Sequence, residues 1–104
     1  MDENNVLVSA SIYNEQYFVN PYYNSIPKEV LEELRIICVT LSAKLHCIFT
    51  IGFNEEGNIF INTKSLENDL DYDEIGAKLE INKLLKEKKG LIRALELWYR
   101  VFII

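Results

Sequence analysis

The chain has 104 residues, a formal net charge of −5 and 49% hydrophobic residues, so it has room for one core, and we predict a single domain over residues 1–104. The acidic balance excludes a groove for the phosphate backbone, and we predict no nucleic-acid partner. No uncharged run approaches the roughly 20 residues of a bilayer-spanning helix, and the acidic N-terminus is unlike a signal peptide, so we predict a soluble protein without a membrane partner.

The first strand is predicted where every second residue is apolar and faces the core: Val6, Val8, Ala10 and Ile12. A second strand follows at 16–20, and a two-residue loop at Asn14-Glu15 pairs Ile12 with Tyr17. The same loop pairs Ala10 with Val19. We therefore predict a hairpin followed by a loop at 21–25.

A helix is predicted to start at Pro27 and to end around residues 42–44, because proline suits the first helical turn. One face of this helix is apolar at helical spacing: Val30, Leu34, Ile37, Cys38 and Leu41. Cys38 and Cys47 both lie in apolar runs, which favours buried free thiols in a reducing cytoplasm, although two cysteines can also form one disulfide.

The next hairpin has the strongest register signal in the chain. Residues 45–53 alternate in polarity, and Asn54-Glu55-Glu56-Gly57 has the composition of a type I turn with glycine in the left-handed position. This turn predicts three cross-strand pairs on the apolar face of the hairpin: Phe53 with Ile59, Ile51 with Ile61, and Phe49 with Thr63. On the opposite face it places Phe60 across from Gly52.

The remaining residues predict an acidic loop and then helix. Ile75 and Leu79 share a helical face, but Ile81 is out of phase with them. Residues 73–80 therefore form either a separate turn or short helix, or the start of the last helix. In the first case the last helix restarts with Asn82 as its N-terminal cap. An apolar stripe continues to Phe102, and we expect this helix to pass through Gly90. The elements together predict an α+β two-layer sandwich: a four-stranded, mostly antiparallel sheet in ββαββα order, covered on one face by two helices.

Four segments carry a resemblance to known sequences: 33–39, 53–58, 72–76 and 94–102. Together they resemble a family of small uncharacterised bacterial proteins. The resemblance spans nearly the whole chain. It implies a small bacterial, cytoplasmic protein, and it implies no activity, catalytic residue or cofactor.

Asp69, Asp71, Asp73 and Glu80 have the carboxylate spacing of a calcium-binding loop, at relative positions 1, 3, 5 and 12. The turn position that requires glycine is Glu74, and a helix over 73–80 would separate the oxygens. We therefore predict a solvated acidic loop and no metal site. His46 is the only histidine, and in a strand its side chain points away from Cys47, so we predict no catalytic pair and no cofactor.

Eight of the ten residues from Leu95 to Ile104 are apolar, which is more than one buried stripe requires. These residues form either a helix buried on several sides or a docking surface. The candidate interface residues are Leu97, Trp98, Val101, Phe102 and Ile104. Five aromatic residues near the N-terminus raise the same two possibilities: Tyr13, Tyr17, Phe18, Tyr22 and Tyr23.

The sequence favours a non-enzymatic protein-interaction or regulatory module whose partner is another protein or, in a homodimer, a second copy. The alternative is a small-ligand binder or minor enzyme that uses the exposed sheet face, with these residues: His46, Thr50, Asn62 and Lys64. A third hypothesis is that an acidic partner binds the basic patch formed by Lys83, Lys86, Lys88 and Lys89.

Overall fold

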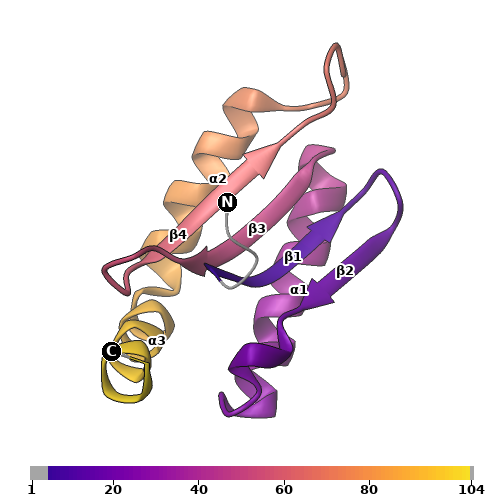
Figure 1. Ribbon diagram of the computed structural model, residues 1–104. Coiled ribbons are helices and arrows are strands. Elements are labelled where there is room, and N and C mark those ends of the chain that lie inside the picture. Colours follow the sequence, from indigo (N-terminus) through magenta and orange to yellow (C-terminus); the bar gives the residue numbers. More distant parts are fainter. Residues whose placement is uncertain (1–4, 104) are drawn as a thin grey trace.

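The computed structural model describes residues 5–103, which form an antiparallel sheet and three α-helices (Figure 1). In chain order the elements are β1 (Val6–Ser11), β2 (Gln16–Val19), the 3-10 turn η2 (Pro21–Tyr23), α1 (Lys28–Leu45), β3 (Ile48–Phe53), β4 (Ile59–Lys64), α2 (Glu74–Glu87) and α3 (Lys89–Phe102). The four strands lie in the order β2-β1-β3-β4, and each neighbouring pair is antiparallel. The predicted α+β fold is therefore confirmed, with its final helical stretch divided into two helices.

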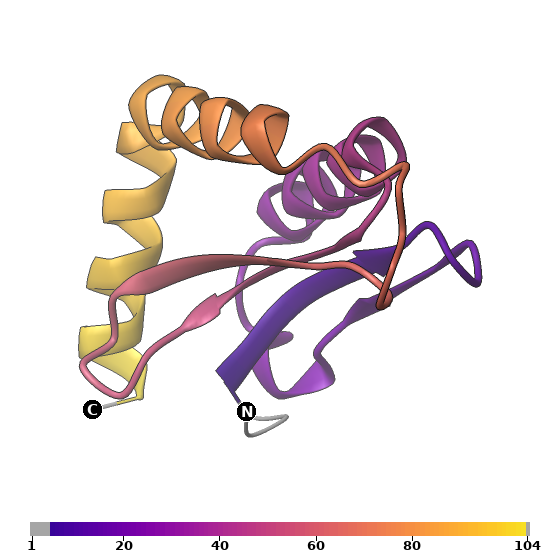
Figure 2. The same cartoon turned by 90° about the horizontal axis from the view of Figure 1, so that it is seen from above.

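The helices form a layer on one face of the sheet. Figure 2 shows α1 and α2 over that face, and it shows α3 turning steeply away from α2 and running past the end of the sheet where β3 and β4 join. Among residues 5–103, none of the helices combines the length and the apolar character needed to cross a bilayer.

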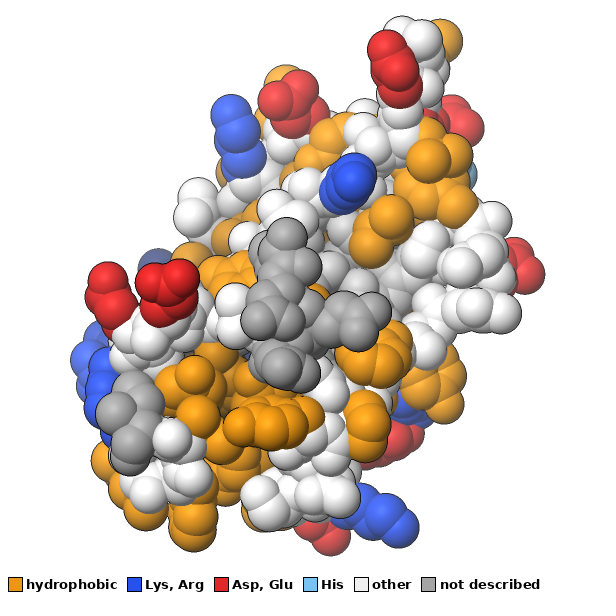
Figure 3. All heavy atoms as spheres, in the orientation of Figure 1, with side chains coloured by type: hydrophobic (Ala, Val, Ile, Leu, Met, Phe, Trp, Pro, Cys, Tyr) orange, Lys and Arg blue, Asp and Glu red, His pale blue; other side chains and the backbone are white. Residues whose placement is uncertain are grey.

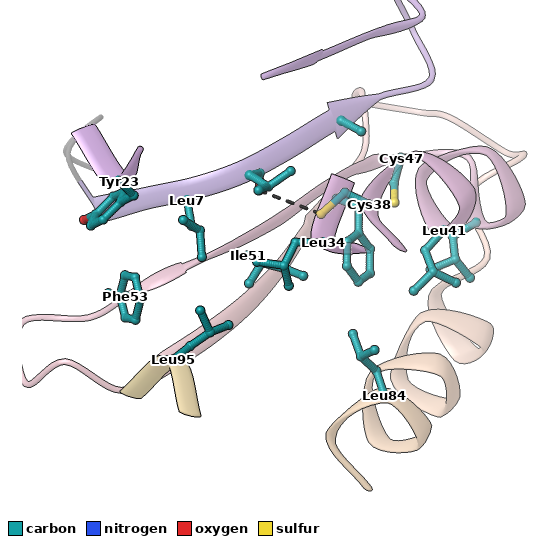
Figure 4. Packing of buried hydrophobic residues seen from close by; sticks show 14 of the residues in the cluster. Leu7, Tyr23, Leu34, Cys38, Leu41, Cys47, Ile51, Phe53, Leu84 and Leu95 are labelled. Carbon is teal, nitrogen blue, oxygen red and sulfur yellow. Dashed lines mark hydrogen bonds between the residues drawn. The ribbon is translucent and has the colours of Figure 1, made fainter. Parts of the chain in front are cut away.

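The core lies between the sheet and the helical layer (Figure 4). Alternate residues of β3, namely Phe49, Ile51 and Phe53, are buried there, as the predicted alternation requires. The helices contribute a second set of buried side chains: Leu34, Cys38, Leu41 and Leu45 from α1, Leu84 from α2 and Leu95 from α3. Burying each leucine or phenylalanine stabilises the fold by about 1.5–3 kcal/mol, so β3 and α1 hold the domain together.

The predicted β3–β4 register is confirmed at every pair. Phe53 pairs with Ile59, and Gly52 pairs with Phe60. The turn closes with a hydrogen bond of 2.8 Å from the Asn54 backbone N–H to the Asn58 carbonyl oxygen, and Gly57 has the expected left-handed φ of 83°.

The predicted β1–β2 register is wrong by two residues. Tyr17 pairs with Ala10 and not with Ile12, because the connection has four residues, 12–15, with Glu15 at a φ of 52°. A shift of two residues leaves every side chain on the same face of the sheet, so the apolar pattern could not distinguish the two registers.

A bulge in β1 corrects a second prediction. Val6 pairs with Gly52 while Val8 pairs with Ile51, so one extra residue, Leu7, is inserted in β1. Leu7 is fully buried and Val6 is only partly buried, so Leu7 occupies the core position that we predicted for Val6.

The third correction concerns the end of α1. The predicted strand over 45–53 begins only at Ile48, because α1 continues to Leu45 and His46 is its left-handed C-terminal cap, with a φ of 59°. Leu45 is 1% exposed and extends the buried stripe one turn beyond Leu41, which favours the longer helix.

The last correction concerns the C-terminal helices. Residues 73–80 do not form a separate helix, and no helix restarts at Asn82, because α2 runs unbroken from Glu74 to Glu87. The Asp73 carboxylate caps α2 by accepting the Gly76 N–H at 2.7 Å. The break lies at Lys88, whose backbone angles of −107° and 24° are not helical. The helix does pass through Gly90, as predicted, but within α3.

Candidate functional site

A polar cluster of Tyr13, His46 and Asp69 ties three loops together at one end of the sheet. The Tyr13 hydroxyl donates to Asp69 Oδ2 at 2.5 Å, and His46 Nδ1 lies 2.8 Å from the same oxygen. The Tyr13 and His46 rings meet edge to face, with centroids 5.3 Å apart. We call these three side chains the clasp. They lie 23 to 56 residues apart in the chain, so no local pattern could have indicated them.

Backbone groups complete the clasp. The Tyr13 hydroxyl also lies 3.1 Å from the His46 carbonyl oxygen and accepts the Leu66 N–H at 3.1 Å. Asp69 Oδ1 accepts the Asp71 N–H at 2.9 Å. The clasp therefore joins the β1–β2 loop, the end of α1 and the β4–α2 loop. It holds the acidic loop over 65–73 through Asp69, while the other acidic residues of that loop, Glu67, Asp71 and Asp73, are exposed to solvent.

The charges of the clasp are fixed by its contacts. The hydroxyl of Tyr13, followed by His46 and the Asp71 N–H, lowers the pKa of the Asp69 carboxyl, because each stabilises the carboxylate. Partial desolvation and the hydrogen bond to Asp69 raise the pKa of the Tyr13 phenol. At neutral pH a neutral phenol therefore donates to a carboxylate, which is an arrangement suited to holding loops in place.

The clasp overlaps the residues with the best geometry for a metal ion in the described part of the chain. His46, Asp69 and Asp71 offer ligand atoms within 4.8 Å of one another. Asp69 Oδ2 already lies within hydrogen-bonding distance of Tyr13 and His46, and Oδ1 accepts the Asp71 N–H, so the clasp uses most of the acceptor capacity of this carboxylate. The four carboxylates with calcium-loop spacing do not form one shell, because Asp73 caps α2 and Glu80 pairs with Lys44.

The structure separates one residue of the predicted ligand site from the other three. His46 leaves the strand and its ring lies against Asp69. Thr50 is 7% exposed with its hydroxyl 2.8 Å from that of Ser9, and it pairs across the strands with Asn62, which is exposed, as is Lys64. Two surface grooves of about 310 and 300 Å³ lie elsewhere, one between the β1–β2 hairpin and α1 and the other between α1 and α2. Neither groove is lined by His46.

The cysteines are core residues. Cys38 and Cys47 are both fully buried and unpaired, and Cys38 Sγ lies 3.8 Å from the Val8 carbonyl oxygen (Figure 4). Burial raises the pKa of Cys38 to about 12 and that of Cys47 to about 11. Both thiols therefore stay protonated at neutral pH, which makes them poor nucleophiles.

The inner side of α3 packs on an aromatic cluster. The Phe53 ring lies 4.6 Å from the Tyr99 ring and 6.4 Å from the Trp98 ring, centroid to centroid, and Tyr23 lies 6.0 Å from Trp98. Leu95 is buried beside them. Trp98, one of the candidate interface residues, is half-buried and packs against this cluster.

The other side of α3 is apolar and faces solvent. Leu97 and Val101 are each 62% exposed and lie one turn apart. Gly90 and Ala94 continue the same row toward the start of the helix, at spacings of four and three residues. We call Gly90, Ala94, Leu97 and Val101 the outer surface of α3. Phe102 borders this surface at the end of the helix: it is 68% exposed, and its ring lies 5.6 Å from that of Trp98. Ile104 lies outside the described residues.

Other predicted contact residues lie in different surroundings. Tyr23 is buried, whereas Tyr17, Phe18 and Tyr22 are about half exposed. Lys88 of the predicted basic patch lies 3.7 Å from Glu33, at the break between α2 and α3. Figure 3 shows hydrophobic side chains gathered at the end of the molecule that holds α3, so this end is the main apolar surface in that view.

Residues 4–104 match the sequence model of a family of unknown function. The chain belongs to DUF6145. This membership covers nearly the whole chain and confirms the resemblance to an uncharacterised family. No curated protein and no solved structure matches the chain. The description of DUF6145 names no activity.

Proposed function

We propose that this chain is a non-enzymatic protein-interaction module whose contact surface is the outer surface of α3. One observation carries the proposal: Leu97 and Val101 are each 62% exposed, although the opposite side of the same helix is packed into the aromatic cluster. At the end of the helix Phe102 adds a ring that contacts Trp98 and is still 68% exposed. A helix that covers a single core needs only one apolar stripe, and contiguous exposed apolar side chains of this size usually mark a contact surface.

The energetics support a protein partner. Covering the exposed parts of Leu97, Val101 and Phe102 would contribute about 1–2 kcal/mol for each side chain. The total of about 3–6 kcal/mol is comparable with the lower end of the roughly 4–15 kcal/mol that association costs in lost freedom. A partner must therefore bring further apolar or charged contacts.

The polar groups support the same proposal. The imidazole of His46 is engaged by Asp69, and both thiols are buried and protonated. The groups best suited to acid–base or nucleophilic chemistry thus serve the fold. A photo-crosslinking amino acid placed at residue 97 and expressed in the native cells tests the proposal.

The proposal predicts covalent protein adducts from position 97. The matched control is position 36 on α1, where Ile36 is also apolar and 52% exposed but lies outside the outer surface of α3. Position 36 should give no comparable adducts. If the two positions give the same adduct pattern, α3 is not a preferred contact surface and the proposal fails.

A further inference from the structure

Charge is distributed unevenly along the second half of the chain. Residues 83–100 hold six basic and two acidic residues, for a formal charge of +4: the bases are Lys83, Lys86, Lys88, Lys89, Arg93 and Arg100. Residues 65–80 hold six acidic residues and one basic residue, for a formal charge of −5. The β3–β4 turn lies at the same end as α3 and carries Glu55 and Glu56, and Lys88 lies 3.7 Å from Glu33 (Figure 1). The positive charge is therefore concentrated on α3 itself, which holds three basic residues, Lys89, Arg93 and Arg100, and one acidic residue, Glu96.

The acidic segment also exposes apolar side chains. Leu70 is 97% exposed in the β4–α2 loop, and Leu66 in the same loop is 56% exposed. Ile75 and Leu79 lie one turn apart on α2 and are 75% and 65% exposed. Segment 65–79 therefore combines exposed apolar side chains with negative charge, as α3 combines them with positive charge.

These two surfaces cannot meet within one molecule. The acidic loop and α3 lie at opposite ends of a domain whose long axis is 42 Å (Figure 1). Each surface is thus available to another molecule, and each matches the other in charge and in apolar character.

We infer that the outer surface of α3 binds segment 65–79 of a second copy of this chain. This inference rests on the proposed function, and it names the partner. Two copies that lie side by side in opposite directions can form the contact twice, which closes a two-fold dimer. Pairing α3 with α3 is disfavoured, because each α3 holds three basic residues and one acidic residue.

Two charge-reversed variants test the inference by sedimentation velocity. The first is Glu67→Lys with Asp71→Lys in the acidic segment, and the second is Lys89→Glu with Arg93→Glu on α3; all four side chains are exposed. The matched control for the first variant is Glu15→Lys with Glu29→Lys, which makes the same change of charge at other exposed positions. The control for the second is Lys28→Glu with Lys64→Glu.

The wild-type chain should associate at concentrations up to about 500 μM, and less so at 1 M salt, where charges are screened within about 3 Å. Each test variant alone should weaken association at least tenfold, and an equimolar mixture of the two should restore it. Both control variants should associate within a factor of three of the wild type. A monomeric wild type, or an acidic-segment variant that associates as well as its control, would overturn the inference.

The inference and the proposed function fail differently. If the acidic-segment variant associates normally while Leu97→Ser prevents association, α3 remains the contact surface and only its partner segment is misidentified. Folding is checked by circular dichroism and thermal unfolding of each variant. Should Asp71→Lys disturb the clasp, Glu67→Lys with Leu70→Ser replaces the first variant, because the Leu70 side chain is almost fully exposed.

Discussion

Two glycines provide a sharp test of the backbone description, because the same substitution should have opposite effects at each. Gly90 lies in the first turn of α3, and a Cβ added there has no neighbouring atom within 4 Å. Gly52 lies in β3, where a Cβ would overlap the Asn5 carbonyl oxygen and come within 2.7 Å of the Phe60 ring. Phe60 thus covers bare backbone, as the predicted register requires.

Gly90→Ala should stabilise the chain by about 0.4–1 kcal/mol, because alanine reduces the entropy of the unfolded chain and favours the helix. For a domain of this size that gain raises the midpoint of thermal unfolding by roughly 2–8 °C. Gly52→Ala should instead destabilise it by about 1–3 kcal/mol, as overpacking does. Circular dichroism at low protein concentration measures both. A lower midpoint for Gly90→Ala would refute our description of the α2–α3 junction.

Three further predictions address the clasp and the core. The pKa of Asp69 lies below its unfolded value, so its ionised form contributes stability above about pH 4 that is lost as the pH falls through the folded pKa; the urea midpoint of Asp69→Asn should be lower than that of the wild type at pH 7, and the gap should be smaller at pH 3. A gap of equal size at both pH values would contradict the role given to Tyr13. Cys38 and Cys47 should resist iodoacetamide at pH 8 in the native state and react fully in urea, as counted by mass spectrometry, and labelling of the native protein would disprove their burial. Phe53→Ala should cost about 3–5 kcal/mol in urea unfolding, and a loss below 1 kcal/mol would show that α3 is attached by other contacts.

The sequence was informative where two independent local signals agreed. The β3–β4 hairpin had an alternating apolar pattern and a turn with glycine in the required place, and its register is confirmed. The β1–β2 hairpin had only the pattern, because Asn14-Glu15 is a poor two-residue turn, and its register was wrong by two residues. Turn chemistry, rather than alternation, therefore fixes register in this chain.

Boundaries between elements were harder to predict because tertiary packing decides them. Leu45 fits either the end of a helix or the start of a strand, and the core space beside Leu41 favours the helix. The consequence for the site is large. A helix longer by one to three residues moves His46 out of the sheet and next to Asp69, so the clasp depends on a choice that local sequence leaves open.

The apolar C-terminus left two possibilities open, a buried helix or a docking surface, and the structure shows that α3 is buried on one side and exposed on the other. The break at Lys88 turns α3 away from α2, so α3 meets the sheet at its end, where Leu91, Leu95, Trp98 and Tyr99 pack against the core. Leu97 and Val101, on the other side of the helix, then face solvent. A straight helix continuing α2 would not present this surface, so the non-helical residue between α2 and α3 creates the exposed face on which the proposed interaction depends.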